Sequence, residues 1–472
     1  MGAIATNRFR VLNARTFINS ASNYYLFIGR PQPWASDTSP DTPLDAEQTV
    51  QFVYDDIIAM KKITASDRSL GIAKRDWTSG QYYNMYRHDY DGTKTVKTLG
   101  GGNHTPATLA DANYYVVASN NNVYVCLYAP ETASTDNPGG YGTNSYAPIA
   151  ASDGYRWLFV SKPTSAEVVK FVTNDYFPVK TLSADPGVGT EDYTQWLGQV
   201  NADTKAGCVY TVLIESGGTG YGITQSNIPI TVKGDGTGFA ATATSNAGGA
   251  ISSITISNNG TGYSWMTLTV GGTGSNAVLQ AIITPASGLG ANPENDLNAF
   301  YTVVTTRLEY AEGGGTFPVQ NDYRRLGLLV DPLQYGTTDA LTATTANNCF
   351  ILDVDNPTSG SLVIDGIIED DTTKARGIIV DVQVGATSVV KVIRTPVENN
   401  LAGADPSAVF ASGHPYNLYT SGGVASGSGP DINTVTPPDV EPNSGLVAYY
   451  ENRRPITRAD NQVEDVKVVF QF

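Results

Sequence analysis

The sequence predicts a mainly β protein with several domains: antiparallel sheets or sandwiches form a framework with few helices, and two small β domains are inserted into it. Three observations support this prediction. The chain has 472 residues, more than one hydrophobic core usually holds. Only 16% of its residues are charged, and its 48 glycines indicate many turns. A glycine-rich β pattern also occurs twice, which indicates an internal duplication.

Residues 1–200 are predicted to form the N-terminal part of the framework. An apolar run at 24–28 predicts a strand, and the prolines of Gly29-Arg30-Pro31-Gln32-Pro33-Trp34 favour an extended segment after it. Thr42 is a suitable cap for a helix in which apolar residues recur at helical spacing as far as Met60. Residues 114–117 and 123–127 predict a hairpin.

Residues 205–290 are predicted to form an inserted, duplicated glycine-rich unit. Gly218-Thr219-Gly220-Tyr221 recurs as Gly260-Thr261-Gly262-Tyr263, and each copy continues into a short alternating strand and a second glycine turn. We expect the two copies to pack on each other, because neither can bury a face alone. The tyrosine after each turn favours a cap over the strands, with sugar stacking as the alternative.

The framework returns at residues 295–335, and a second inserted unit, a small β barrel, is predicted at 340–425. Its strands are expected at 349–354, 377–382 and 389–393. Residues 421–442 are rich in Gly, Ser and Pro and predict a flexible linker back to the framework.

Residues 440–472 are predicted to complete the framework with a C-terminal strand. Val466, Val468, Phe470 and Phe472 alternate along the strand and share one face. Such an apolar face has to be covered, either by the protein itself or by a neighbouring molecule.

The sequence indicates no catalytic, cofactor or metal site. The three cysteines, at 126, 208 and 349, lie far apart and are typical of small buried apolar residues. The three histidines, at 88, 104 and 414, are isolated, and the acidic run 369–371 predicts a solvated turn more readily than a calcium loop. Gly218, Gly220 and Gly222 are followed by a strand, so they favour turns over a dinucleotide loop.

Charge and hydropathy limit the partners. The net charge is −16 and no basic cluster exceeds two residues, so nucleic acid is not expected as a partner. There is no run of about 18 apolar residues, and Arg8, Arg10 and Arg15 interrupt the N-terminal segment. We therefore expect no membrane partner and synthesis in the cytoplasm.

Several arginines stand beside aromatic residues or proline: Arg30, Arg75, Arg324 and the pair Arg453 and Arg454. In a chain so poor in basic residues, this placement indicates bidentate pairing or stacking at fixed sites. Partners within the chain and partners in another molecule explain the pattern equally well.

Four segments that each combine arginine with aromatic residues follow one another in a distinctive order: 25–36, Arg75-Asp76-Trp77, Asp153-Gly154-Tyr155-Arg156-Trp157-Leu158-Phe159 and Tyr450-Glu451-Asn452-Arg453-Arg454-Pro455-Ile456. Two further segments, 123–127 and 323–332, match more weakly and occur in the same order along the chain. Together with the closing strand, these segments resemble the baseplate wedge protein called gene product eight of T-even-type contractile-tailed phages. The resemblance covers roughly residues 1–200, 300–335 and 440–472, and leaves both inserted units outside it.

The resemblance implies a non-enzymatic, β-rich structural subunit that forms a homodimer, binds other wedge proteins and helps to hold the baseplate before contraction. It implies a location in the virion, at the tail baseplate, after assembly in the host cytoplasm. A glycan-binding tail-fibre or adhesin-like module is the alternative function, and a polysaccharide depolymerase is a third. The expected framework or interface residues are Arg30, Trp34, Arg75, Trp77, Trp157, Arg324, Arg453, Arg454, Phe470 and Phe472.

Overall fold

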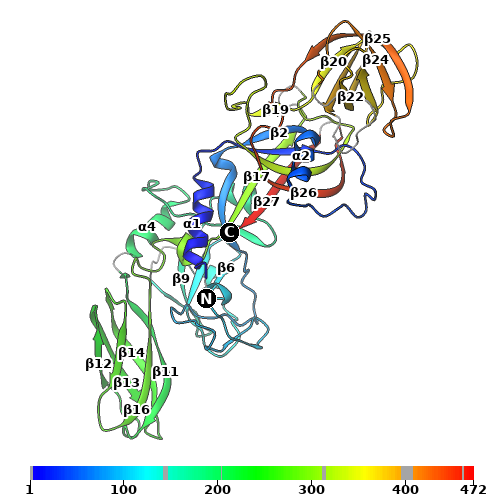
Figure 1. Ribbon diagram of the computed structural model, residues 1–472. Coiled ribbons are helices and arrows are strands. Elements are labelled where there is room, and N and C mark those ends of the chain that lie inside the picture. Colours follow the sequence, from blue (N-terminus) through cyan, green and yellow to red (C-terminus); the bar gives the residue numbers. More distant parts are fainter. Residues whose placement is uncertain (1–3, 142–146, 203–204, 311–314, 395–407, 460–461) are drawn as a thin grey trace. The chain divides into compact units, whose positions relative to one another are not determined.

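The computed structural model describes residues 4–141, 147–202, 205–310, 315–394, 408–459 and 462–472 (Figure 1). The chain divides into two compact units. Unit 1 comprises Met1–Asn19, Ser69–Val303 and Val469–Phe472, and unit 2 comprises Ser20–Arg68 and Val304–Val468. Strands dominate both units and form several antiparallel sheets, so the predicted mainly β fold with few helices is confirmed.

The core of unit 1 lies around a four-stranded sheet in the order β6-β7-β9-β8. Its strands are Tyr115–Val117, Val123–Tyr128, Arg156–Ser161 and Ile149–Ala150, and the first two form the predicted hairpin. Almost every residue of β7 and β9 is buried, which explains their nearly continuous apolar sequence. The short elements β4 (Val96–Lys97), β5 (Asn103–His104), η2 (Leu109–Asp111) and η3 (Pro138–Gly140) belong to the connections of this unit.

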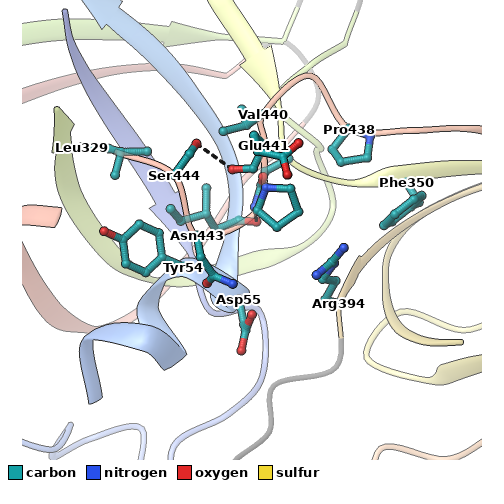
Figure 2. A pocket seen from close by; sticks show the side chains of 13 residues that line it. Tyr54, Asp55, Leu329, Phe350, Arg394, Pro438, Val440, Glu441, Asn443 and Ser444 are labelled. Carbon is teal, nitrogen blue, oxygen red and sulfur yellow. Dashed lines mark hydrogen bonds between the residues drawn. The ribbon is translucent and has the colours of Figure 1, made fainter. Parts of the chain in front are cut away.

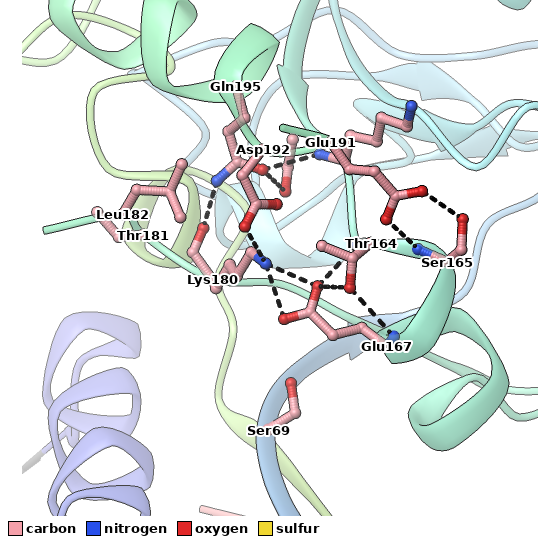
Figure 3. A network of polar contacts seen from close by, with 12 residues as sticks. Ser69, Thr164, Ser165, Glu167, Lys180, Thr181, Leu182, Glu191, Asp192 and Gln195 are labelled. Atoms are coloured by element: carbon pink, nitrogen blue, oxygen red, sulfur yellow. Dashed lines mark hydrogen bonds and ion pairs between the residues drawn. The ribbon is translucent and has the colours of Figure 1, made fainter. Parts of the chain in front are cut away.

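Two helices are held in unit 1 by a polar network (Figure 3). Thr164 and Glu167 form a capping box at the start of α3 (Ser165–Phe171). Lys180 donates to Glu167 at 2.7 Å and to Asp192 at 2.9 Å, just before α4 (Tyr193–Ala202). Gln195 of α4 accepts from Ser161 at the end of β9 at 3.0 Å. The network therefore ties both helices to the strands.

The glycine-rich insertion consists of six strands in which the two copies interlock. The copies are β11 (Val209–Thr219), β12 (Ile228–Gly234), β13 (Thr237–Ser245) and β14 (Ile251–Thr261), β15 (Met266–Val270), β16 (Ser275–Ile283). Strand β11 pairs with β16, β12 with β15, and β13 with β14, so every one of these pairs joins one copy to the other. The expectation that the copies pack on each other is confirmed.

Tyr221 and Tyr263 cap the two apolar cores of this duplicated module. Each side chain is at most 6% exposed, and each belongs to a different core cluster. The close approach of these rings explains why positions 236 and 274 are glycine. A Cβ atom at Gly236 would overlap with Tyr263, and one at Gly274 would overlap with Tyr221. The rings are thus core residues and present no platform for a sugar.

The N-terminal helix of unit 1 was not predicted. Helix α1 (Asn7–Ile18) buries only Val11 and Ala14, so its apolar signal is weak. Arginines hold it instead: Arg15 donates to Glu294 of α5 (Pro293–Asp296) at 2.5 Å. Arg8, Arg10 and Arg15 interrupt the apolar pattern of this segment. Contacts of Arg10 and Arg15 with other parts of unit 1 stabilise the helix.

A second sheet has the order β10-β3-β17-β27. Its strands are Tyr176–Pro178, Arg68–Ala73, Tyr301–Glu309 and Val463–Gln471. The predicted C-terminal strand is therefore present as β27, at one edge of this sheet.

Unit 2 contains a five-stranded sheet in the order β19-β2-β1-β18-β26. Its strands are Thr345–Asn347, Ile57–Ile63, Tyr24–Gly29, Asp322–Val330 and Leu446–Thr457. Strand β1 is buried along its whole length, as expected for a strand between two neighbours. Segments far apart in the chain thus become adjacent strands.

The helix expected from Thr42 is shorter than predicted. Helix α2 (Glu47–Asp56) begins after Ala46, which makes no side-chain cap, and the turn η1 (Ala65–Asp67) follows the next strand. Ile57 and Met60 lie in β2 because pairing with β1 and burial override their helical spacing.

The second insertion is a closed six-stranded barrel, β20-β23-β22-β21-β24-β25 (Figure 1). The strands are Phe350–Val354, Ser388–Arg394, Arg376–Val384, Ile367–Asp370, His414–Tyr419 and Ala425–Thr436, and 395–407 lie outside the described residues. The three strands expected here are confirmed.

One prediction in this region is wrong, and a second holds only in part. Residues 421–442 are no flexible linker, since β25 is a barrel strand whose Gly427 and Gly429 leave room for Ser359 and the Tyr416 ring. The acidic run forms a solvated turn only at Asp371, which is exposed. Glu369 and Asp370 are at most 2% exposed.

Hydrogen bonds and ion pairs explain why both carboxylates can be buried. Glu369 pairs with Arg376, while Asp370 accepts from His414 Nδ1 at 3.0 Å and from two backbone N–H groups at 2.9 Å. His414 is therefore no isolated surface histidine.

Candidate assembly site: the arginine and tryptophan cluster of unit 2

Three antiparallel strands of unit 2 bring together three of the segments singled out in the sequence. Gly29 of β1 lies opposite Arg325 of β18, and Arg325 lies opposite Asn452 of β26. Arg30 follows with a positive φ of 53°, and its N–H donates to the carbonyl of Asp56 at 3.0 Å. A Cβ at position 29 would lie 2.7 Å from that carbonyl oxygen, so glycine is required there.

Asp56 is the acidic centre of this arrangement. Its carboxylate pairs with Arg325 at 2.5 Å and with Arg30 at 3.6 Å. The side chains of Asp56 and Arg325 are both only 4% exposed. A buried carboxylate between two guanidinium groups makes the three side chains interdependent, because the loss of any one leaves a buried charge without its partner.

Trp34 covers the arginines. The Arg30 guanidinium lies 3.9 Å from the centre of the indole ring, and Arg325 lies 5.6 Å from it. The indole Nε1–H donates to the backbone carbonyl of Arg453 at 2.8 Å. Tyr450 closes the other side, since its ring centre is 5.6 Å from Arg325. We call Arg30, Trp34, Asp56, Arg325 and Tyr450 the Arg–Trp cluster.

Arg324 forms a second, adjacent set of contacts. Its guanidinium donates to both carboxylate oxygens of Asp37 at 3.0 Å, to Asp322 at 3.0 Å, and to the carbonyl of Pro31. The hydrogen bond from Arg324 holds the pKa of Asp37 below its usual value, together with the N–H of Trp34. Arg324 thus fixes the segment that follows β1.

Arg453 and Arg454 differ from the buried arginines. Both are exposed, and Arg453 pairs with Glu451 at 2.5 Å. Within the described part of the chain, Arg454 makes no hydrogen bond or ion pair. These two side chains lie at the surface beside the Arg–Trp cluster, because Arg453 supplies the carbonyl that Trp34 binds.

The expected residues of unit 1 have internal structural partners. Arg75 donates to the carbonyl of Ala110 at 3.0 Å and lies 4.5 Å from the Tyr115 ring centre. Trp77 Nε1–H donates to Ser134 at 3.1 Å. Trp157 is fully buried.

Phe470 and Phe472 lie against α1 in unit 1. The Phe17 ring centre is 5.7 Å from both phenylalanine rings. The N–H of Phe472 donates to the carbonyl of Phe300 at 3.0 Å, and Arg10 Nε donates to the carbonyl of Phe472 at 2.5 Å. The molecule itself therefore covers part of the C-terminal apolar face.

The sequence pointed to the arginines and tryptophans but not to the acids that pair with them. Asp56 stands before an apolar run and Asp37 among small polar residues, and neither belongs to a motif. Only the pairing of β1 with β2 and β18 brings Asp56 to the arginines, so no local signal could have identified it.

The small cavity of unit 2 offers little chemistry. A cavity of about 20 Å³ in unit 2 is lined by Tyr54, Phe350, Arg394 and Glu441, among others (Figure 2). This volume holds roughly one water molecule. Among the described residues, no group of three or more His, Cys, Asp or Glu side chains is arranged to bind a metal ion. None of the helices described is long and apolar enough to cross a membrane.

Comparison with protein-family models gives no match for this chain, and neither does comparison with curated proteins.

Proposed function

We propose that this protein is a structural subunit of the baseplate wedge of a contractile phage tail, where it pairs with a second copy and joins other wedge proteins. It acts through its surfaces and not through catalysis. The observation that carries the proposal is the convergence of segments 25–36, 323–332 and 450–456, which supply the resemblance to the wedge family, on three adjacent strands of unit 2.

The Arg–Trp cluster supports this proposal physically. Its charged groups are used inside the unit, so they stiffen a sheet and leave no reactive group. A rigid sheet edge with exposed arginines beside it suits a part that has to hold its shape within an assembly. Arg453 and Arg454 are the side chains we propose for contact with a partner.

The alternative function, a glycan-binding module that uses the repeated tyrosines, gains no support from Tyr221 and Tyr263. Both rings are buried in the cores of the duplicated module. We therefore do not propose sugar binding by these two residues.

Sedimentation of the full chain, alone and with the other baseplate proteins of the phage that encodes it, tests the proposal. We expect a dimer that enters a larger complex with at least one of these proteins. The double variant Arg453→Glu with Arg454→Glu should weaken complex formation, while Arg307→Glu, another exposed arginine, should not. A stable monomer that binds none of the baseplate proteins would refute the proposal.

A further inference from the structure

Unit 1 contains a large open groove that the assembly proposal does not use. Its volume is about 1100 Å³. Sites for small molecules usually measure about 300–1000 Å³, so the groove has room for an oligomer and not only for a single small ligand. One wall consists of connections and strand ends of the framework, and the other consists of β11 and β14 of the duplicated module.

The two walls are fixed to each other by hydrogen bonds. Arg156 at the start of β9 donates to the carbonyl of Tyr210 and to the hydroxyl of Thr211 on β11, the latter at 3.2 Å. Thr211 in turn donates to the carbonyl of Leu127 at 2.9 Å. The groove is thus a built feature at the base of the module.

Two tyrosines supply aromatic surface in the groove. Tyr128, at the end of β7, is 38% exposed, and Tyr82 is partly exposed. The Tyr82 ring lies over Gly101, where an added Cβ would come within 3.1 Å of it. Neither phenolic hydroxyl has a hydrogen-bond partner among the described residues, so each presents an apolar ring together with an unused polar group.

The charged groups of the groove favour an uncharged ligand. The cations are already engaged: Arg87 pairs with Asp89 at 2.7 Å, and Lys97 donates to Asn103 at 3.0 Å. Glu131 is exposed and lines the groove without a partner in the described part of the chain. With a net charge of −16, the protein repels polyanions.

From these features we infer that the groove binds an uncharged oligosaccharide. A sugar ring has an apolar C–H face that stacks on an aromatic ring, and hydroxyl groups at its rim that exchange hydrogen bonds with phenols and carboxylates. A peptide would need deep apolar pockets for anchor residues. The aliphatic side chains at this wall, such as Ile254 and Leu213, instead pack into cores of unit 1.

Saturation-transfer NMR with the full chain and a panel of uncharged hexasaccharides, namely cellohexaose, maltohexaose, mannohexaose and chitohexaose, tests this inference. We expect at least one of them to bind at millimolar concentration. Tyr82→Ala and Tyr128→Ala should each weaken binding about tenfold, which corresponds to about 1.4 kcal/mol. Tyr128→Phe, which keeps the ring, should weaken binding less than Tyr128→Ala.

Tyr193→Ala is the matched control, because Tyr193 is also partly exposed in unit 1 but does not line the groove. It should leave binding unchanged. Failure of all four oligosaccharides to bind would overturn the inference. Equal binding by the wild type and both alanine variants, or binding of only an anionic heparin hexasaccharide or an extended peptide, would also overturn it.

Discussion

Buried arginines determine how unit 2 is held together at the scale of single residues. The sequence showed that these arginines stand beside rigid neighbours, and that feature predicted fixed sites. It did not identify their partners. Asp56 meets Arg325 only through strand pairing, and a carboxylate at the end of a helix has many other possible surroundings.

Replacing Asp56 tests the importance of this pairing. Asp56→Ala leaves Arg30 and Arg325 close together without a counter-charge, so we expect a loss of about 3 to 5 kcal/mol in the opening free energy of β1 and β18. Native-state hydrogen exchange at these strands measures it. Asp465→Ala removes a pair whose side chains are more than half exposed and should cost less than about 1 kcal/mol. Equal losses in the two variants would contradict this account.

Asp296 makes the folding stability of unit 1 depend on pH. Burial raises the pKa of this carboxyl from 3.8 to about 7, near Arg8 and Tyr86, while Gly290 N–H donates to it at 2.7 Å. Between these two pKa values the folded state binds more protons than the unfolded state. Stability therefore falls as the pH rises through this window, and the loss is complete above about pH 7.

Asp296→Asn should remove this dependence. Relative to the wild type, we expect the variant to gain on the order of 2 to 3 kcal/mol between pH 5 and pH 8. Urea unfolding at both pH values measures the difference. A constant offset between the two proteins would show that Asp296 is ionised in the folded state throughout.

Elements with strong alternation or long apolar runs were predictable, and elements held by tertiary contacts were not. Strands such as β1 and β7 are apolar because both faces are buried. The sequence of β25 resembles a flexible linker because it is rich in glycine. In the structure these glycines allow close packing within the barrel. Helix α1 has little apolar periodicity, and it depends on arginine contacts and on the C-terminal phenylalanines.

Removing residues 470–472 tests the role of the chain end as an element. Phe17 then loses its contacts with the Phe470 and Phe472 rings, and Arg10 loses the carbonyl to which it donates. We therefore expect the opening free energy of α1 to fall by about 2 to 4 kcal/mol. The amides of α1 should exchange much faster.

Phe9→Ser alters an exposed residue of the same helix and should leave exchange unchanged. If the truncated chain keeps normal protection in α1 and loses only binding to a partner, the terminus is an intermolecular joint and not part of the fold.

At the scale of the whole molecule, the segments of the framework are separated in the chain by two inserted units. The duplicated module was recognisable from its recurring glycine turns, and the barrel from its series of short strands. Neither insertion interrupts a strand of the five-stranded sheet. The five-stranded sheet therefore accommodates both additions without a break in its strands.

We propose that this framework is a fixed part of a contractile tail baseplate. A cryo-electron microscopy map of the assembled phage tail tests it most directly. We expect density for the five-stranded sheet and the Arg–Trp cluster in every wedge, with Arg453 and Arg454 at a protein interface. A resolved baseplate that lacks this chain, or that contains it only at the tips of fibres, would contradict it.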